Sequence, residues 1–188
     1  MIAGIAGLSV VLFVLSAVDD LKPLSATLRL LVHGVVAIAM VLFWAASFER
    51  AFPPTLELTH WLSSPLGLVF TALAIAWMTN LYNFMDGADG LVGGMTLIGF
   101  GSYGVALAGA SAGGSLALLV SALAGGAAGF LLFNFPPAKV FMGDAGSIPL
   151  GFLAAAAGVH GTLMGAWPWW FPILVFSPFI VEIGRAHV

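Results

Sequence analysis

Long apolar segments separated by short polar ones follow one another along the whole chain. A helix needs about 20 mostly apolar residues to cross a bilayer core of about 30 Å, and most of the apolar segments approach that length. The pattern predicts seven helices, at residues 2–18, 28–48, 66–82, 91–110, 115–133, 148–164 and 170–181, the last too short to span fully. The segments lack the alternation of a membrane β-barrel, so we predict an all-α, polytopic transmembrane helical bundle.

The order of these helices assigns each polar segment to one side of the membrane. Successive crossings bring residues 19–20, 80–90 and 134–147 to the same side, and residues 49–65 and 110–114 to the other. Basic residues near the two sides are Lys22, Arg29 and Lys139 against Arg50, which shares the second side with Glu49, Glu57 and His60. Because positive residues favour the cytoplasmic side, we predict that the first side faces the cytoplasm.

Composition narrows the class of protein further. Hydrophobic residues make up 61% of the 188 positions and charged residues 7%, which excludes an ordinary soluble domain and a disordered chain. The chain has no cysteine, so it is not a disulfide scaffold, and its net charge of −3 argues against a nucleic acid partner. Residues 1–18 are interpreted as a spanning helix and not as a cleaved signal, because no basic region precedes them.

Three tryptophans, Trp167, Trp169 and Trp170, surround Pro168 before the last predicted helix. Amphipathic rings prefer the membrane interface, so we predict that this group marks the interface on the far side. Packing within the protein core is the alternative interpretation.

Two adjacent carboxylates, Asp19 and Asp20, end the first predicted helix, and Lys22 follows them. Neighbouring carboxylates repel each other, and a divalent cation or a shared proton relieves the repulsion. Acidic residues at the carboxyl end of a helix also oppose the helix dipole, which disfavours a purely stabilising role. A metal or catalytic site fits this segment, and so does a solvated acidic helix end with Lys22 as its counter-ion.

A second polar segment occupies residues 80–91. Asn80, Asn83 and Asp86 recur every three residues and would share one helix face, with Asp89 one step further. Gly87 and Gly90 permit a turn that exposes backbone amides. The full EF-hand pattern is absent, and amides and carboxylates at a bilayer edge are costly without partners. A ligand site is therefore favoured over a merely polar turn.

The third polar segment occupies residues 133–147. Paired prolines end the preceding helix, and two glycines bracket Asp144, so that its carboxylate can approach a ligand. Ser147 is predicted to be the N-cap of the next helix, whose free amides would favour an anion. Asn134 and Lys139 belong to the same segment, and Lys139 fits a phosphate contact or an interfacial position equally well.

Phosphate chemistry would explain why these segments come together. Transfer between phosphates needs a magnesium ion, held by one or two carboxylates and by substrate oxygens, to neutralise developing charge. It also needs an oriented nucleophile, which a lipid phosphate supplies itself, so the protein must mainly position and desolvate the reactants. Carboxylates at the membrane surface are suitably placed for this task.

These segments, in this order, resemble the polyprenyl-phosphate N-acetylhexosaminyl-1-phosphate transferase family. The matching stretches are Asp19 and Asp20 with residues 24–30, residues 80–91, and residues 133–147. The family contains the undecaprenyl-phosphate GlcNAc-1-phosphate transferases and the phospho-MurNAc-pentapeptide translocases. All three stretches together make the resemblance specific.

The resemblance implies transfer of N-acetylhexosamine 1-phosphate from a UDP-sugar to undecaprenyl phosphate, with release of UMP and with magnesium, or else manganese, as cofactor. It implies that Asp144 is the metal ligand and that Asp19 and Asp20 are the catalytic pair beside the lipid phosphate. The residues then implied to contact the substrates are Asn80, Asn83, Asp86, Asp89, Lys22, Asn134 and Lys139.

The resemblance also implies a setting. The wording of residues 80–90 and 133–138 is similar to that of enzymes that begin O-antigen or related surface polysaccharides, with the phospho-MurNAc-pentapeptide transferase of peptidoglycan synthesis as the alternative. The implied location is the bacterial inner membrane, with the active site facing the cytoplasm. Assembly of the protein as a homodimer is a further possibility.

Family members are expected to have about ten or eleven helices and a His-rich cytoplasmic loop. We therefore interpret residues 1–181 as a transferase core truncated at both ends, in which His33, His60 and His160 do not replace the missing loop. Residues 182–188 resemble a translated sequencing adapter and are predicted to be non-native. A cation transporter and a non-catalytic membrane protein stay open, although no clear internal repeat typical of transporters is evident.

Overall fold

A computed structural model describes residues 1–47, 61–62, 64–108 and 114–182 of the chain. The helices bounded within these ranges are Ile2–Leu21 (α1), Ala26–Ala45 (α2), Pro65–Met85 (α5), Leu91–Ala108 (α6), Gly114–Asn134 (α7), Asp144–Leu163 (α8), Trp170–Val175 (α9) and Ser177–Glu182 (α10). The expectations for Glu49, Arg50, Glu57, His60 and residues 183–188 lie outside the described residues.

Six of these helices, α1, α2 and α5 to α8, are long and apolar enough to cross a membrane, and the described residues form no strand. The prediction of an all-α polytopic bundle is confirmed. The seventh predicted span is divided into α9 and α10, which separate at Phe176. Pro178 explains the break, because proline is tolerated in the first turn of a helix but cannot donate the hydrogen bond that would continue one.

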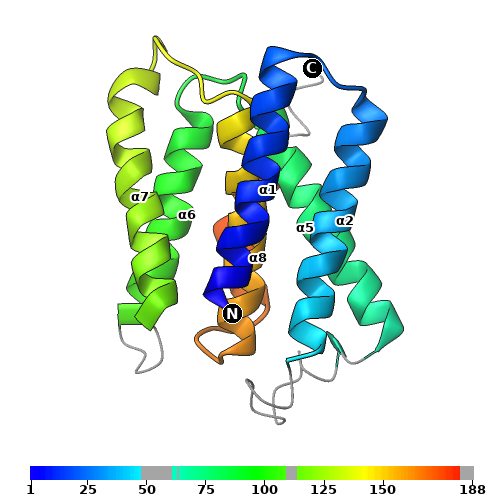
Figure 1. Ribbon diagram of the computed structural model, residues 1–188. Coiled ribbons are helices and arrows are strands. Elements are labelled where there is room, and N and C mark those ends of the chain that lie inside the picture. Colours follow the sequence, from blue (N-terminus) through cyan, green and yellow to red (C-terminus); the bar gives the residue numbers. More distant parts are fainter. Residues whose placement is uncertain (48–60, 63, 109–113, 183–188) are drawn as a thin grey trace.

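The most buried of the six spans is α8, which lies at the centre of the bundle. In Figure 1, α8 lies behind α1, with α5 and α2 on one side and the α6–α7 pair on the other. Its small residues permit this packing: a Cβ atom added to Gly151 would lie 2.6 Å from the Met78 carbonyl oxygen on α5. Because small residues let membrane helices approach closely, α8 can contact α1, α5 and α6 at once.

The three aspartate segments meet at one end of the bundle, as the count of crossings predicts. The connections from α1 to α2, from α5 to α6 and from α7 to α8 all lie at the top of Figure 1, whereas the amino terminus lies at the bottom. Residues far apart in sequence are thus collected at the amino end of α8.

The interpretation of the tryptophan group is wrong for one of its members. Trp167 is only 6% exposed, its indole Nε1–H donates to the Gly158 carbonyl at 3.0 Å, and its ring stacks on Tyr103 with centroids 4.7 Å apart. Trp169 and Trp170 remain exposed. The partners of Trp167 lie on α6 and α8, so a cluster of tryptophans in the sequence alone could not separate a core position from an interfacial one.

Candidate active site

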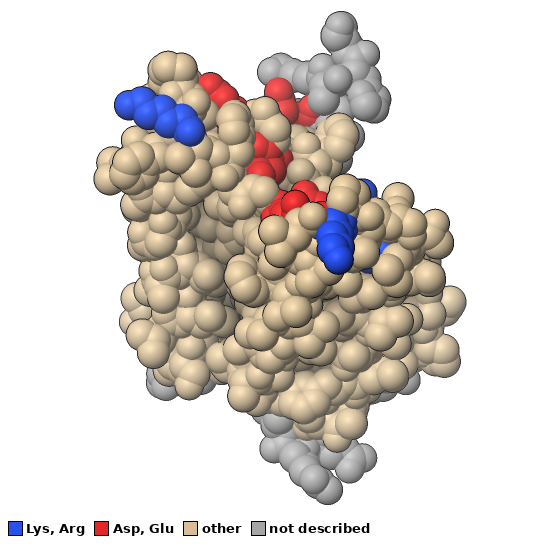
Figure 2. Space-filling model, turned by 45° about the horizontal axis from the view of Figure 1, so that its top comes forward, with Lys and Arg blue, Asp and Glu red and all other residues tan. Residues whose placement is uncertain are grey.

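Acidic side chains gather in a hollow at the top of the bundle. Figure 2 shows them between two raised parts of the surface, with basic side chains on the flanks. Around this hollow the structure brings together residues from α1, α2, the α5–α6 connection and α8. Hydrogen bonds and ion pairs among these residues fix the positions of their side chains.

Asp19 faces the bundle from the last turn of α1 and is buried. Its Oδ1 atom accepts the Leu24 N–H at 2.6 Å, and its Oδ2 atom accepts from the Arg29 guanidinium at 3.0 Å. Ser25 caps α2 by accepting the Leu28 N–H at 3.2 Å. The short turn between the two helices therefore brings Arg29 back to Asp19. The guanidinium charge offsets the unfavourable position of the Asp19 carboxylate at the carboxyl end of α1.

Asp144, the first residue of α8, is held from two sides. The Nη1 atom of Arg29 that bonds Asp19 also lies 3.0 Å from Asp144 Oδ2. Asn83 on α5 donates from Nδ2 to Asp144 Oδ1 at 2.6 Å and to the Ser147 hydroxyl at 3.3 Å. One carboxylate thus links α2, α5 and α8, and one guanidinium nitrogen joins the carboxylates of α1 and α8.

Two further carboxylates occupy the amino-terminal amides of α8. The Gly143 N–H donates to Asp86 Oδ2 at 2.7 Å, and the Ala145 N–H donates to Asp20 Oδ2 at 3.2 Å. Gly143 adopts a φ of 69°, which favours glycine, and it is the N-cap. The prediction that Ser147 caps this helix is wrong, because α8 begins at Asp144. The amides that would follow a Ser147 cap therefore lie inside α8, and two amides at its observed amino end are bonded to carboxylates.

Asp86 lies just beyond α5 and is partly buried. Burial raises the pKa of its carboxyl above the ordinary value, while the N–H groups of Gly143 and Met142 oppose the shift. The charges of Asp144 and Asp20 raise the pKa further. Asp86 therefore holds its proton more readily than an exposed aspartate when no cation is near.

Asp89 and Asn134 hold the α7–α8 connection against the α5–α6 connection. Asp89 Oδ2 accepts the Ala138 N–H at 2.9 Å. Asn134 is 2% exposed, and its amide accepts the Gly90 N–H at 3.0 Å and donates to the Val140 carbonyl at 2.9 Å. These contacts give Asn134 a positioning task, and a direct substrate contact stays a prediction without geometric support.

The other predicted site residues lie around this centre. Asn80 lies one turn below Asn83 and faces His33 on α2, with Oδ1 of the amide 3.3 Å from Nδ1 of the ring. Lys22 and Lys139 are exposed at the two connections. Asp19 is paired with Arg29, so the expected counter-ion role of Lys22 falls to Arg29 instead.

The family of the chain follows from a match that covers this whole arrangement. Residues 2–162 match the model for glycosyl transferase family 4. The chain belongs to glycosyl transferase family 4. The resemblance drawn from the three polar segments is therefore confirmed at the level of the family.

Several curated relatives of this glycosyl transferase family 4 chain are named phospho-N-acetylmuramoyl-pentapeptide-transferase. The protein from Levilactobacillus brevis is 37% identical over 139 residues, which cover 71% of this chain and 42% of the relative. The one from Symbiobacterium thermophilum is 42% identical over 106 residues, 56% of this chain and 32% of the relative. The one from Listeria monocytogenes serotype 4b is 36% identical over 155 residues, which cover 79% of this chain and 45% of the relative. The chain thus spans less than half the length of each relative.

Arg29 is the residue of the site that sequence reasoning missed. In the sequence analysis Arg29 helped to orient the chain in the membrane and lay within the matching stretch of residues 24–30, but it was not named as a site residue, although it joins Asp19 and Asp144. The signal was an arginine ten residues beyond Asp19, after a proline-containing turn that can reverse the chain. Ser147 also belongs to the site, through its bond with Asn83 and not as a helix cap.

The family resemblance implies a magnesium ion, and the donor set can be tested against it. In the described part of the chain, no three His, Cys, Asp or Glu side chains converge to hold a metal by themselves. Magnesium, however, usually takes one or two protein carboxylates and completes its shell with water and substrate phosphates. Asp19 and Asp144 approach closely enough for one nitrogen of Arg29 to contact both at 3.0 Å. Because the guanidinium now lies between these two carboxylates, the partly exposed Asp144 fits such an ion as a single protein ligand.

Proposed function

We propose that this family 4 protein transfers a sugar 1-phosphate from a uridine nucleotide sugar to a polyprenyl phosphate. The observation that carries the proposal is the convergence of carboxylates from three separate segments at the amino end of α8, at one end of a membrane bundle. In the reaction, an oxygen of the lipid phosphate attacks the phosphorus that bears the sugar. The bond from that phosphorus to the oxygen of UMP breaks, and UMP leaves.

Asp144 would hold a magnesium ion together with substrate oxygens. When bound, magnesium would neutralise negative charge on the phosphates. Arg29 would place a second positive charge beside them, because its guanidinium already lies between Asp19 and Asp144. Asn83 would keep the Asp144 carboxylate in a fixed orientation through its 2.6 Å hydrogen bond.

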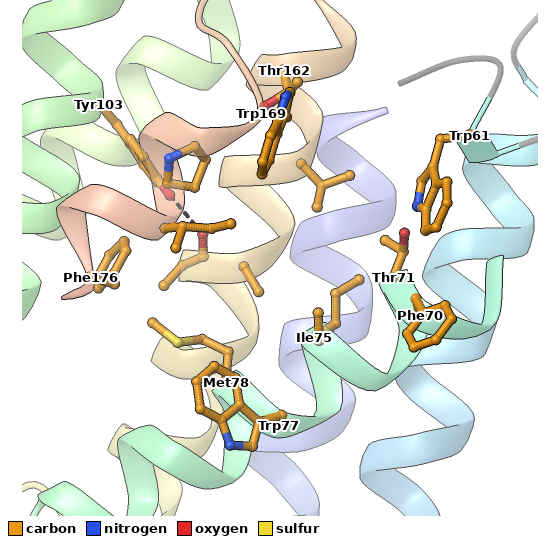
Figure 3. Close-up of a pocket in the computed structure, with 16 residues that line it drawn as sticks. Trp61, Phe70, Thr71, Ile75, Trp77, Met78, Tyr103, Thr162, Trp169 and Phe176 are labelled. Atoms are coloured by element: carbon orange, nitrogen blue, oxygen red, sulfur yellow. Dashed lines mark hydrogen bonds between the residues drawn. The ribbon is translucent and has the colours of Figure 1, made fainter. Parts of the chain in front are cut away.

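A lipid acceptor is supported by an apolar cavity beside α5. The cavity has a volume of about 280 Å³, and Figure 3 shows side chains of α5, including Ile75, Trp77 and Met78, on its wall. Met78, the lining residue of α5 nearest to the carboxylates, lies five residues before Asn83, roughly 8 Å along a helix, and the cavity extends from there toward Thr162 at the carboxyl end of α8. A lipid with its phosphate at the carboxylates could therefore lay an isoprenoid chain along α5, where only apolar contacts are required.

The relatives make the phospho-MurNAc-pentapeptide donor the first candidate, because each of those compared carries that name. The expected O-antigen donor, a UDP-GlcNAc or a relative of it, receives no support from them and becomes the second candidate. The second candidate rests on the sequence of residues 80–90, which is similar to that of enzymes that begin O-antigen or related polysaccharides.

The activity is proposed for a longer protein that contains these residues, since the curated relatives are more than twice as long as the stretches they share with this chain. The proposed location is the bacterial inner membrane, with the carboxylates on the cytoplasmic side, where nucleotide sugars are found. Lys22, Arg29 and Lys139, which lie in or beside the connections at that end of the bundle, support this orientation.

The test is release of UMP by purified protein in nanodiscs. The gene product that contains these residues is supplied with undecaprenyl phosphate, magnesium and one donor at a time: UDP-MurNAc-pentapeptide, UDP-GlcNAc or another UDP-N-acetylhexosamine. We expect UMP to appear only when the lipid is present, and fastest with the first donor. If no donor yields lipid-dependent UMP, the proposed function is wrong, and ion flux in proteoliposomes would then test the transporter alternative.

A further inference from the structure

A polar contact joins α2 and α5 beneath the carboxylates. The Nδ1 atom of His33 on α2 lies 3.3 Å from Oδ1 of Asn80 on α5. His33 follows Arg29 by four residues, and Asn80 precedes Asn83 by three, so each is about one helical turn from its partner. The contact therefore lies one turn deeper than the two side chains that hold Asp144.

The geometry assigns the proton on the imidazole ring. The Asn80 amide nitrogen donates to the Ala76 carbonyl at 2.7 Å, so the amide oxygen faces His33. A neutral ring must then carry its proton on Nδ1 and its lone pair on Nε2. His33 is 3% exposed, and its buried Nε2 has no hydrogen-bond partner among the described residues.

An unpaired buried acceptor costs free energy that an apolar side chain would avoid. Most of the buried residues near this contact in the sequence are apolar, among them Val36 and Ala37 on α2 and Ile75 on α5. Stability alone would therefore favour leucine or another apolar residue at position 33. The free-energy cost of leaving Nε2 unpaired therefore suggests that the contact of Nδ1 with Asn80 has a function.

We propose that His33 is a positioning residue whose contact with Asn80 sets the spacing of α2 and α5. That spacing holds Arg29 and Asn83 on opposite sides of Asp144, with bonds of 3.0 Å and 2.6 Å to its two oxygens. A change in spacing would lengthen one bond or both and misplace the carboxylate. The expected change in kcat rests on the proposed transferase function, whereas the expected change in the distance between α2 and α5 does not.

The inference also changes the task of Asn80. The sequence predicts a substrate contact for this residue, but in the structure its amide oxygen faces His33 and its nitrogen bonds Ala76. Asn80 therefore acts through the position of Asn83, one turn nearer to the carboxylates.

The structural consequence can be measured without turnover. The chain has no cysteine, so paired spin labels can be introduced at Leu30→Cys and Phe84→Cys, two exposed positions next to Arg29 and Asn83. Dipolar EPR in nanodiscs should give a broader or shifted distance distribution for His33→Leu. His33→Asn, which keeps an N–H donor near the position of Nδ1, should restore the distribution. An unchanged distribution in His33→Leu would overturn the proposal.

The kinetic consequence is measured on the complete transferase in nanodiscs. Misplaced catalytic groups chiefly lower kcat, so His33→Leu should lower kcat about tenfold to a hundredfold and change the KM for the nucleotide sugar by less than about threefold. His33→Asn should recover most of kcat. Asn80→Leu should match His33→Leu, and the double variant should be no worse than either, because the two residues act as a unit.

The matched control is His160→Leu, which replaces a second buried histidine at the other end of α8. It should leave kcat and the spin-label distances unchanged in the folded fraction. If His33→Leu lowers only the amount of folded protein, with kcat per folded molecule and the distances unchanged, the role is structural and the inference fails. If the unmodified protein shows no turnover, the proposed function fails instead, and the distances alone decide this inference.

Discussion

The two ends of α8 are held in different ways. At its amino end, main-chain amides and Asp144 are bonded to polar side chains of other segments, including the carboxylates of Asp20 and Asp86. At its carboxyl end, the helix is held by rings and small residues, with Tyr103 stacked on the buried Trp167. The same helix thus carries a polar network at one end and close apolar packing at the other.

This difference indicates how free energy is distributed in the molecule. Apolar burial contributes about 25 cal/mol per Å² removed from water, whereas partly exposed ion pairs contribute about 0–1 kcal/mol. In a membrane the first contribution comes mainly from close packing, but the contrast remains. Substitutions at the amino end should therefore reduce activity with little loss of stability, and substitutions at the carboxyl end should do the reverse.

The largest expected effect is that of Asp144→Asn at the amino end. The change preserves the shape of the side chain but removes the charge that pairs with Arg29 and that would hold magnesium. We expect UMP release to fall at least about a thousandfold, because one electrostatic group at a reacting centre is worth about that much. The thermal midpoint should move little. Retained turnover would show that the metal assignment is wrong.

The opposite expectation applies to Gly161→Ala at the carboxyl end. A Cβ atom at this position would overlap the Trp167 indole, which is itself buried. We expect the free energy of unfolding to fall by about 1–3 kcal/mol, as for other overpacked cores, with kcat unchanged while the protein is folded. Thermal melting in detergent measures the loss.

The matched control for this change is Gly125→Ala on α7, where an added Cβ atom meets nothing within 4 Å. It should leave stability unchanged or raise it by up to about 1 kcal/mol, because alanine favours a helix more than glycine does. Equal losses in the two alanine variants would mean that packing at Trp167 does not distinguish the carboxyl end.

The features predicted from sequence are those that depend on one segment at a time. Apolar length and the number of crossings were enough to find six spans and to gather the aspartates at one end. The helix predicted at residues 91–110 is observed at Leu91–Ala108, and the one at 115–133 is observed at Gly114–Asn134. Such bounds follow from where apolar residues stop, which the sequence shows directly.

The features that the sequence analysis missed depend on contacts between distant segments. Arg29 and Asp144 are separated by 115 positions, so the turn that can return Arg29 to Asp19 does not show that the same guanidinium also contacts Asp144 on α8. The start of α8 was misplaced to Ser147, because the carboxylates that accept from the N–H groups of Gly143 and Ala145, those of Asp86 and Asp20, belong to other segments of the chain. Trp167 was misplaced for the same reason, since its stacking partner lies on α6.

A smaller effect than that of Asp144 is expected for Arg29→Gln. The change removes the cation shared by Asp19 and Asp144 and leaves two carboxylates facing each other. We expect UMP release to fall about a hundredfold. Because the Arg29 side chain is 34% exposed, the free energy of unfolding should change by less than about 1 kcal/mol.

Arg29→Lys separates the effect of the positive charge of this residue from that of its planar guanidinium group. Lysine keeps the charge but is a single ammonium group on a flexible stem, and it lacks the planar guanidinium. We expect it to recover part of the lost activity. Full recovery would mean that charge alone matters, whereas a large loss of stability in either variant would contradict the view that the amino end of α8 contributes little to folding.

The smallest effects are expected for Lys22→Gln and Lys139→Gln, two exposed residues of the α1–α2 and α7–α8 connections. A lysine near a membrane surface attracts an anion by about 1 kcal/mol, so each change should raise the KM for polyprenyl phosphate about fivefold at low salt with kcat unchanged. Salt screens charges beyond about 10 Å at 0.1 M, so the effect should fade as ionic strength rises. A loss that persists at high salt, and that appears in kcat, would place that lysine in direct contact with a phosphate and extend the polar network of the amino end to its rim.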